Sequence, residues 1–121
     1  MIDVRTPPQR KASLYLETAR VDAFHLSRVL GAVAQERERQ EQKGVDKPGW
    51  ETCASATMDP HVKLAVLTEE VGEVARALLE ENAESTANLR AELVQVAAVA
   101  VAWVEALTPP LRAALGEARD A

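Results

Sequence analysis

The chain has 121 residues, a formal net charge of -5 and a single cysteine. This length allows one domain with its own apolar core. The negative charge argues against a general nucleic-acid surface, and a lone cysteine excludes an internal disulfide framework and favours a reducing compartment. Apolar residues make up 47% of the chain but aromatic residues only 3%. Much of this apolar content is alanine and valine, which favours close-packed helices, so we expect an all-α fold.

The N-terminal residues 1–12 are polar, contain Pro7 and Pro8, and are expected to form an arm. Residues 13–121 are expected to form a single domain. The N-terminal region lacks the apolar core of a signal sequence, and no segment reaches the about 18 apolar residues that a membrane-spanning helix needs. We therefore expect a cytoplasmic protein with neither a membrane nor a nucleic acid as partner.

A helical pattern begins near Ser13 and is predicted to stop at Gly44. Its apolar positions recur at helical spacing, at Leu26, Val29, Leu30 and Val33. Residues 35–43 are all polar. This polar run is either a solvated helix face or a surface that offers Arg37, Arg39 and Lys43 to a phosphate group.

A long connection over residues 45–59 contains Pro48, Gly49 and Trp50. Connections of this length are usually functional or disordered. Trp50 can cap the core, which is the commoner outcome, or stack on a nucleotide base. Cys53 is expected to be a small loop residue rather than a nucleophile, because nothing near it in the sequence marks an activating base.

Two further helices are expected after this connection. Asp59 as N-cap and Pro60 at the first helical position predict the start of one that runs to about Asn82. The next is capped by Ser85 or Thr86 and runs to Leu107, where Thr108, Pro109 and Pro110 end it and a last short helix begins, residues 111–118.

The helix that ends at Leu107 is apolar nearly all round over residues 93–104, with Gln95 as the exception. A helix that is apolar on every side is buried on every side. Three or four helices from one chain can hardly enclose it, so we expect at least a homodimer with this helix at its centre.

Acidic residues gather on the same two helices. On one helix Glu69 and Glu70 each share a face with Glu73, and on the next Glu92 shares a face with Gln95. A turn near residues 83–84 folds the two as an antiparallel hairpin and brings Glu73 level with Gln95. Such a cluster repels itself unless a cation holds it, and Mg²⁺ prefers oxygen ligands. Solvated charges and structural ion pairs remain the alternative.

The constellation Glu69-Glu70-x-x-Glu73, followed by Glu92-x-x-Gln95, resembles the motif of the MazG-like all-α nucleoside triphosphate pyrophosphohydrolases. Glu36-Arg37-x-Arg39-Gln40-x-x-Lys43 is similar to a first-helix signature of small MazG-like proteins of bacteria and phages. Those proteins often carry tryptophan directly after the lysine, whereas here Gly44 follows and Trp50 comes later. The resemblance covers roughly residues 22–107.

The resemblance implies an antiparallel helical hairpin with flanking helices, completed to a four-helix core by assembly as a homodimer or a dimer of dimers. It implies cleavage of a nucleoside triphosphate between the α- and β-phosphates, with Mg²⁺, or Mn²⁺ in its place, as cofactor. The implied metal positions are Glu70, Glu73, Glu92 and Gln95. Glu69 is implied as the catalytic carboxylate that orients or deprotonates water, or that helps to hold a second metal ion. The implied substrate-binding residues are Arg37, Arg39, Gln40, Lys43 and Trp50.

One departure supports an alternative function. The family pattern has aspartate where this chain has Gln95, and an amide oxygen brings no charge to a metal ion. The alternative is a helical dimer of the same fold that binds nucleotide, or a partner protein, without turnover. A di-iron bundle needs two Glu-x-x-His units, whereas here Asp22 precedes His25 and His61 stands alone. A DNA-binding helical dimer is disfavoured by the acidic balance.

Overall fold

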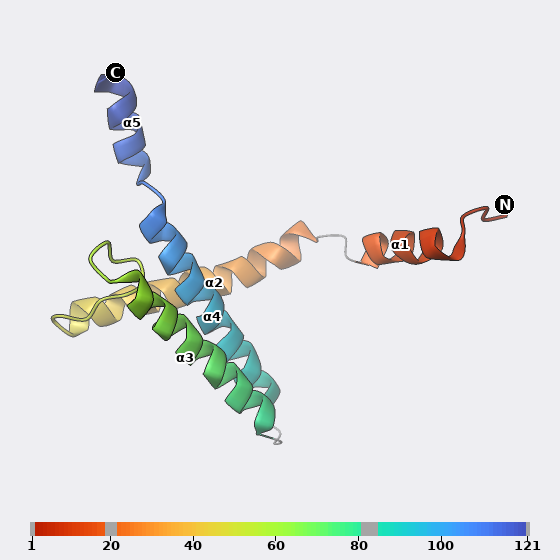
Figure 1. Cartoon of the computed structure of the whole chain (residues 1–121), viewed down its shortest axis with the longest axis horizontal. Helices are drawn as coiled ribbons and strands as arrows, with labels where there is room; N and C mark the ends of the chain where they lie inside the picture. The colour runs from red at the N-terminus through yellow and green to blue at the C-terminus, as the bar shows by residue number, and fades with distance from the viewer. Residues whose placement is uncertain (1, 19–21, 81–84, 121) are drawn as a thin grey trace. The chain divides into compact units, whose positions relative to one another are not determined.

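The computed structural model describes residues 2–18, 22–80 and 85–120. All regular secondary structure in these described residues is helical, which confirms the expected all-α class (Figure 1). The helices in chain order are α1 (Pro7–Thr18), α2 (Ala23–Asp46), α3 (Pro60–Leu79), α4 (Ser85–Leu107) and α5 (Leu111–Asp120). The predicted helix end at Asn82 and the predicted turn at residues 83–84 lie outside the described residues.

Side chains that cap the helix ends explain where the first helices begin. The Thr6 backbone N–H donates to Gln9 Oε1 at 2.8 Å, and the Gln9 backbone N–H donates to Thr6 Oγ1 at 3.4 Å. This reciprocal capping box starts α1 at Pro7, earlier than the helical pattern at Ser13 predicts and inside the stretch expected to be an arm. Asp22 Oδ1 accepts the backbone N–H groups of residues 24 and 25 and so begins α2 as a separate helix.

Of the next two helix boundaries, the start of α3 was predicted correctly and the end of α2 was not. Asp59 is the N-cap of α3 and accepts the His61 backbone N–H at 2.7 Å, with Pro60 in the first turn, which confirms the predicted start. The predicted end of α2 at Gly44 is wrong, because the helix continues to Asp46. The turn comes instead at Gly49, whose φ of +87° lies in a region that favours glycine.

Two compact units make up the chain, Met1–Leu30 and Gly31–Ala121, and their boundary falls within α2. The first unit contains α1, and in the residues before this helix Arg5 pairs with Asp3 at 2.9 Å. All of the residues predicted to form a functional site belong to the second unit, which is therefore the part of the chain that bears on function.

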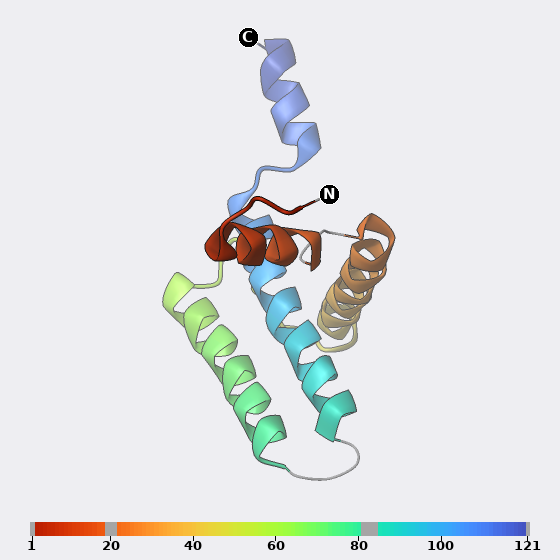
Figure 2. The same ribbon diagram turned by 90° about the vertical axis from the view of Figure 1, so that its right-hand side faces the viewer.

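The core of the second unit forms where α3 and α4 pack side by side (Figures 1 and 2). Cys53, Val99 and Ala102 are buried there. Partly buried residues pack around them, namely Ala54, Met58, Val66, Leu67 and Trp103. The long connection therefore contributes Cys53 to the core, while Trp50 stays 48% exposed and does not cap it.

The apolar surface of α4 is divided between the core and solvent. Ala98 and Ala102 on one side are 0% and 1% exposed, whereas Val104 and Leu107 on another are 61% and 76% exposed. Helix α3 likewise exposes Leu64, Val71 and Leu78, which lie at seven-residue spacing along one side of the helix. Within a single chain, therefore, α4 is not buried on every side, and both helices carry uncovered apolar stripes.

One stretch, Ala87–Ala113, is long and apolar enough to cross a membrane, judged by length and composition alone. The expectation that no segment meets this requirement is therefore too strict. The same stretch provides Val99 and Ala102 to the core, and the apolar core helices of many proteins have the same composition.

Candidate functional site

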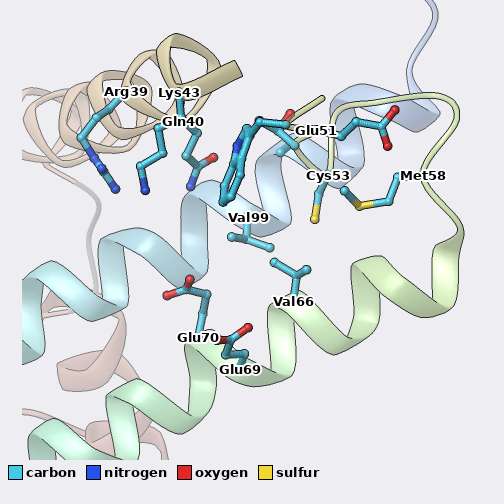
Figure 3. A pocket seen from close by; sticks show the side chains of 13 residues that line it. Arg39, Gln40, Lys43, Glu51, Cys53, Met58, Val66, Glu69, Glu70 and Val99 are labelled. Atoms are coloured by element: carbon cyan, nitrogen blue, oxygen red, sulfur yellow. The ribbon is translucent and has the colours of Figure 1, made fainter. Parts of the chain in front are cut away.

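A cavity of about 280 Å³ lies between α2, α3, α4 and the connection after α2 (Figure 3). Its lining divides by chemistry into an apolar floor, a nitrogen-bearing rim on α2, and an acidic rim on α3. The floor consists of the side chains of Cys53, Met58, Val66, Val99 and Ala102. A site with an apolar floor and charged rims suits a ligand that has one flat apolar part and one charged part.

The α2 rim consists of Arg39, Gln40 and Lys43, whose spacing puts them on one face of the helix. Figure 3 shows their side chains reaching from α2 toward the space above Val99 and Glu70. Arg39 Nε donates to Glu36 Oε2 at 2.8 Å. This hydrogen bond, against an opposing effect of burial, raises the pKa of Arg39, and the charges of Glu36 and Glu70 raise it further.

Trp50 lines the cavity at the start of the connection, just after the turn at Gly49. Lys43 Nζ lies 5.6 Å and Lys47 Nζ 5.8 Å from the centre of its ring. Both distances are within the range of a cation–π interaction. The half-exposed ring therefore lies beside the cavity with two cations over it.

The acidic rim is centred on Glu70, which lines the cavity together with Glu69. Burial raises the pKa of Glu70, and the charges of Glu92, Glu69, Glu73 and Glu36, in decreasing order, raise it further. The predicted acidic cluster across α3 and α4 is thus present as an electrostatic unit. Its carboxylates repel one another in the absence of a cation.

These carboxylates are not gathered into a ready set of metal ligands. Within residues 2–18, 22–80 and 85–120, no three His, Cys, Asp or Glu side chains form a group able to hold a metal ion. Glu73 instead pairs with Arg76 at 2.9 Å on the same helix. The oxygen donors are of the kind that Mg²⁺ prefers, but metal binding requires their side chains to converge further.

Gln95 faces a different hollow, of about 360 Å³, which is also lined by Glu36, Arg39, Arg90 and Val94. Arg39 lines both this hollow and the cavity that contains Glu69 and Glu70, whereas Gln95 lines the hollow and not the cavity. The structure therefore does not bring the Gln95 amide together with Glu69 in one cavity.

Arg37 also lies outside the cavity, although it belongs to the same signature as Arg39. Its side chain is 8% exposed, and its guanidinium pairs with Glu41 and with Glu105 of α4, both at 2.8 Å. The hydrogen bond to Glu105, against the effect of burial, raises the pKa of Arg37. Arg37 therefore connects α2 with α4.

Three residues in or beside the cavity were not predicted to belong to the site. Glu36, beside the cavity, belongs to the quoted signature, but its approach to Glu70 depends on where α2 passes α3 and α4. Glu51 is held by the Thr57 hydroxyl, which donates to it at 2.6 Å. Cys53 was expected in the loop, yet it forms part of the floor, and burial raises the pKa of its thiol.

The chain matches no model of a known protein family, no curated protein and no solved structure. The site itself and the resemblance of its two motifs are therefore the only indications of what the protein does.

Proposed function

We propose that the protein is a Mg²⁺-dependent nucleoside triphosphate pyrophosphohydrolase that releases a nucleoside monophosphate and pyrophosphate. The observation that carries this proposal is the position of Glu70. It is a half-buried carboxylate whose pKa is raised by burial and by four neighbouring carboxylates, and it lies in the wall of a cavity opposite Arg39 and Lys43. An acidic cluster facing a basic rim across a ligand-sized space is the arrangement that a metal–phosphate complex requires.

In this proposal Glu70, Glu73, Glu92 and Gln95 would hold the Mg²⁺ ion. The ion supplies charge neutralisation on the phosphoryl oxygens and an ordered geometry for displacement. To take part, Glu73 must release Arg76. Gln95 would contribute its amide oxygen from the adjoining hollow. The three glutamates would then be the only charged ligands of the ion.

Glu69 is the proposed base. Its carboxylate would take a proton from a water molecule, whose oxygen attacks the α-phosphorus. The bond from that phosphorus to the bridging oxygen of the β-phosphate breaks, and pyrophosphate leaves. Arg39 and Lys43 would neutralise the charge that accumulates on the leaving group.

The base and sugar would lie toward the floor and Trp50. Trp50 is 48% exposed and lines the cavity beside the apolar floor, so its indole ring would stack on a base without rearrangement of the core. Base–aromatic stacking is tolerant of base identity, which suits an enzyme that acts on more than one nucleotide.

We also propose that α3 and α4 form an antiparallel hairpin and that two copies pair through it to complete a four-helix core. The support is the pair of uncovered stripes, which include Leu64, Val71 and Leu78 on α3 and Val104 and Leu107 on α4. Exposed apolar patches of this kind mark interaction surfaces. A second copy rather than lipid would cover them, because Glu105 on α4 pairs with Arg37. The proposed location is the cytoplasm.

The alternative, a nucleotide-binding or partner-binding helical dimer without turnover, is favoured by Gln95. Its lack of charge and its place beside Arg90 would weaken metal binding. A panel of nucleoside triphosphates, incubated with Mg²⁺ or Mn²⁺ and assayed for pyrophosphate and monophosphate, separates the two functions. Release of both products in equal amounts supports the hydrolase. Nucleotide binding without release from any member of the panel supports the alternative.

A further inference from the structure

Arg37 uses three nitrogen atoms to bind three side chains, those of Gln40, Glu41 and Glu105. Its Nε donates to Glu105 Oε1 at 3.2 Å and its Nη2 to Glu105 Oε2 at 2.8 Å, which gives a two-point ion pair between α2 and α4. Nη2 also donates to Glu41 Oε1 at 2.8 Å, and the same oxygen accepts the Thr52 hydroxyl at 2.7 Å. The guanidinium is therefore fixed by contacts with α4 and, through Glu41, with the connection.

The remaining contact of Arg37 determines how Gln40 is presented to the cavity. Arg37 Nη1 donates to Gln40 Oε1 at 3.0 Å. A guanidinium has donors and no acceptor, so only the oxygen of the Gln40 amide can face it. The amide NH₂ group is left on the other side, and Gln40 lines the cavity with Arg39 and Lys43 (Figure 3).

We infer that Arg37 is a positioning residue and that the fixed Gln40 amide binds substrate as a hydrogen-bond donor. With Arg39 and Lys43, it completes a rim that offers the cavity donors alone. Such a rim fits the oxygen atoms of a phosphate chain, which only accept hydrogen bonds. That the bound phosphate groups belong to a nucleotide rests on the proposed function, whereas the orientation of the Gln40 amide does not.

A sharp test is Gln40→Glu. The new carboxylate still accepts the Arg37 hydrogen bond, with added charge attraction, so the helix connection is kept. The group that faces the cavity changes from a donor to a negatively charged acceptor. Gln42→Glu is the matched control, since Gln42 is an exposed residue of the same helix that does not line this cavity.

The probe is inorganic tripolyphosphate with Mg²⁺, titrated by calorimetry into the full chain. We expect Gln40→Glu to weaken its binding by about ten- to a hundredfold, as for loss of a hydrogen bond to a charged group. The melting temperature should stay the same or rise, and Gln42→Glu should bind as the wild type does. Unchanged affinity in Gln40→Glu, or no binding of tripolyphosphate to the wild type, would overturn the inference.

A double-mutant cycle tests the role of Arg37. Arg37→Met should weaken tripolyphosphate binding when Gln40 is present and have no further effect in a Gln40→Met background. An equal loss in both backgrounds would show that Arg37 contacts the ligand directly and is not a positioning residue. If Arg37→Met fails to fold, the Gln40→Glu titration still decides whether the amide faces the ligand.

The inference and the proposed function can fail separately. If the wild type hydrolyses no nucleotide but Gln40→Glu loses tripolyphosphate binding, the role of Gln40 as a donor is supported and the hydrolase is contradicted. If Gln40→Glu releases pyrophosphate at the wild-type rate, the hydrolase is supported and the role of Gln40 is contradicted.

Discussion

The carboxyl group of Glu70 on α3 is coupled to that of Glu92 on α4. After burial, the charge of Glu92 is the largest cause of the raised pKa of Glu70. Two residues on neighbouring helices therefore hold like charges together in a half-buried place, which costs stability unless a proton or a cation is bound.

The first prediction concerns this cost. Because the pKa of Glu70 is higher in the folded protein than its unfolded value of about 4.3, the folded state binds the proton more tightly. Stability should therefore fall as pH rises from the unfolded value through the folded one. Without metal, Glu70→Gln should unfold at higher urea concentration than the wild type at pH 7, by about 0.5 to 1 kcal/mol.

At pH 4 the difference between Glu70→Gln and the wild type should be smaller than at pH 7, because Glu70 is then mostly protonated in both the folded and the unfolded state. Glu38→Gln, at an exposed carboxylate of α2, is the control. A gain at pH 7 that persists undiminished at pH 4 would show that the benefit of Glu70→Gln is unrelated to charge.

The second prediction concerns Gln95. Gln95→Asp adds a negative charge next to the acidic cluster and should tighten Mg²⁺ binding about tenfold, measured as the metal-dependent rise in melting temperature. Glu73→Gln should abolish that rise. If the metal affinity of Gln95→Asp is unchanged, Gln95 is not a metal ligand and only lines the hollow that it shares with Arg90.

The third prediction concerns Trp50. Trp50→Leu should weaken nucleotide binding by about 1 to 3 kcal/mol, the range for loss of base stacking. The affinity for inorganic tripolyphosphate should not change. Because Trp50 is half exposed, the variant should melt close to the wild-type temperature. If the affinity for nucleotide and for tripolyphosphate falls equally, Trp50 maintains the shape of the cavity and does not stack on the base.

The fourth prediction concerns assembly. The wild type should be a dimer or a dimer of dimers at micromolar concentration, measured by light scattering. Val104→Glu should reduce it to a folded monomer, because an unpaired charge in a buried interface costs several kcal/mol. Val45→Glu is the control at an exposed position on α2. Val99 is unsuitable for this test since it lies in the core of one chain. A monomeric wild type would rule out the proposed pairing.

The helices were predictable where the signals that set them are local. Asp59 caps its own helix through an atom two residues away, and the alternation of apolar and polar positions is likewise a short-range property. The starts of α1 and α2 were missed because the capping pairs Thr6–Gln9 and Asp22–His25 were not recognised, although they too are local.

The site was predictable only in part. The helical spacing of Glu69, Glu70 and Glu73 alone predicts a cluster of carboxylates that repel one another. The role of Arg37 was not predictable, because its partner Glu105 lies on a different helix and the pairing depends on how α2 passes α4. Nor did composition reveal which residue of the connection enters the core, Cys53 or Trp50.

The alkylation rate of Cys53 can report how deeply a ligand enters the cavity of the unmodified protein. It is the only cysteine in the chain and lies at the cavity floor, and burial keeps its thiol protonated to higher pH than usual. Alkylation by a small reagent should be slow, and mass spectrometry can follow it as a single added group. A ligand that reaches the floor will shield the sulfur, whereas one that stays at the α2 rim will leave its rate of reaction unchanged.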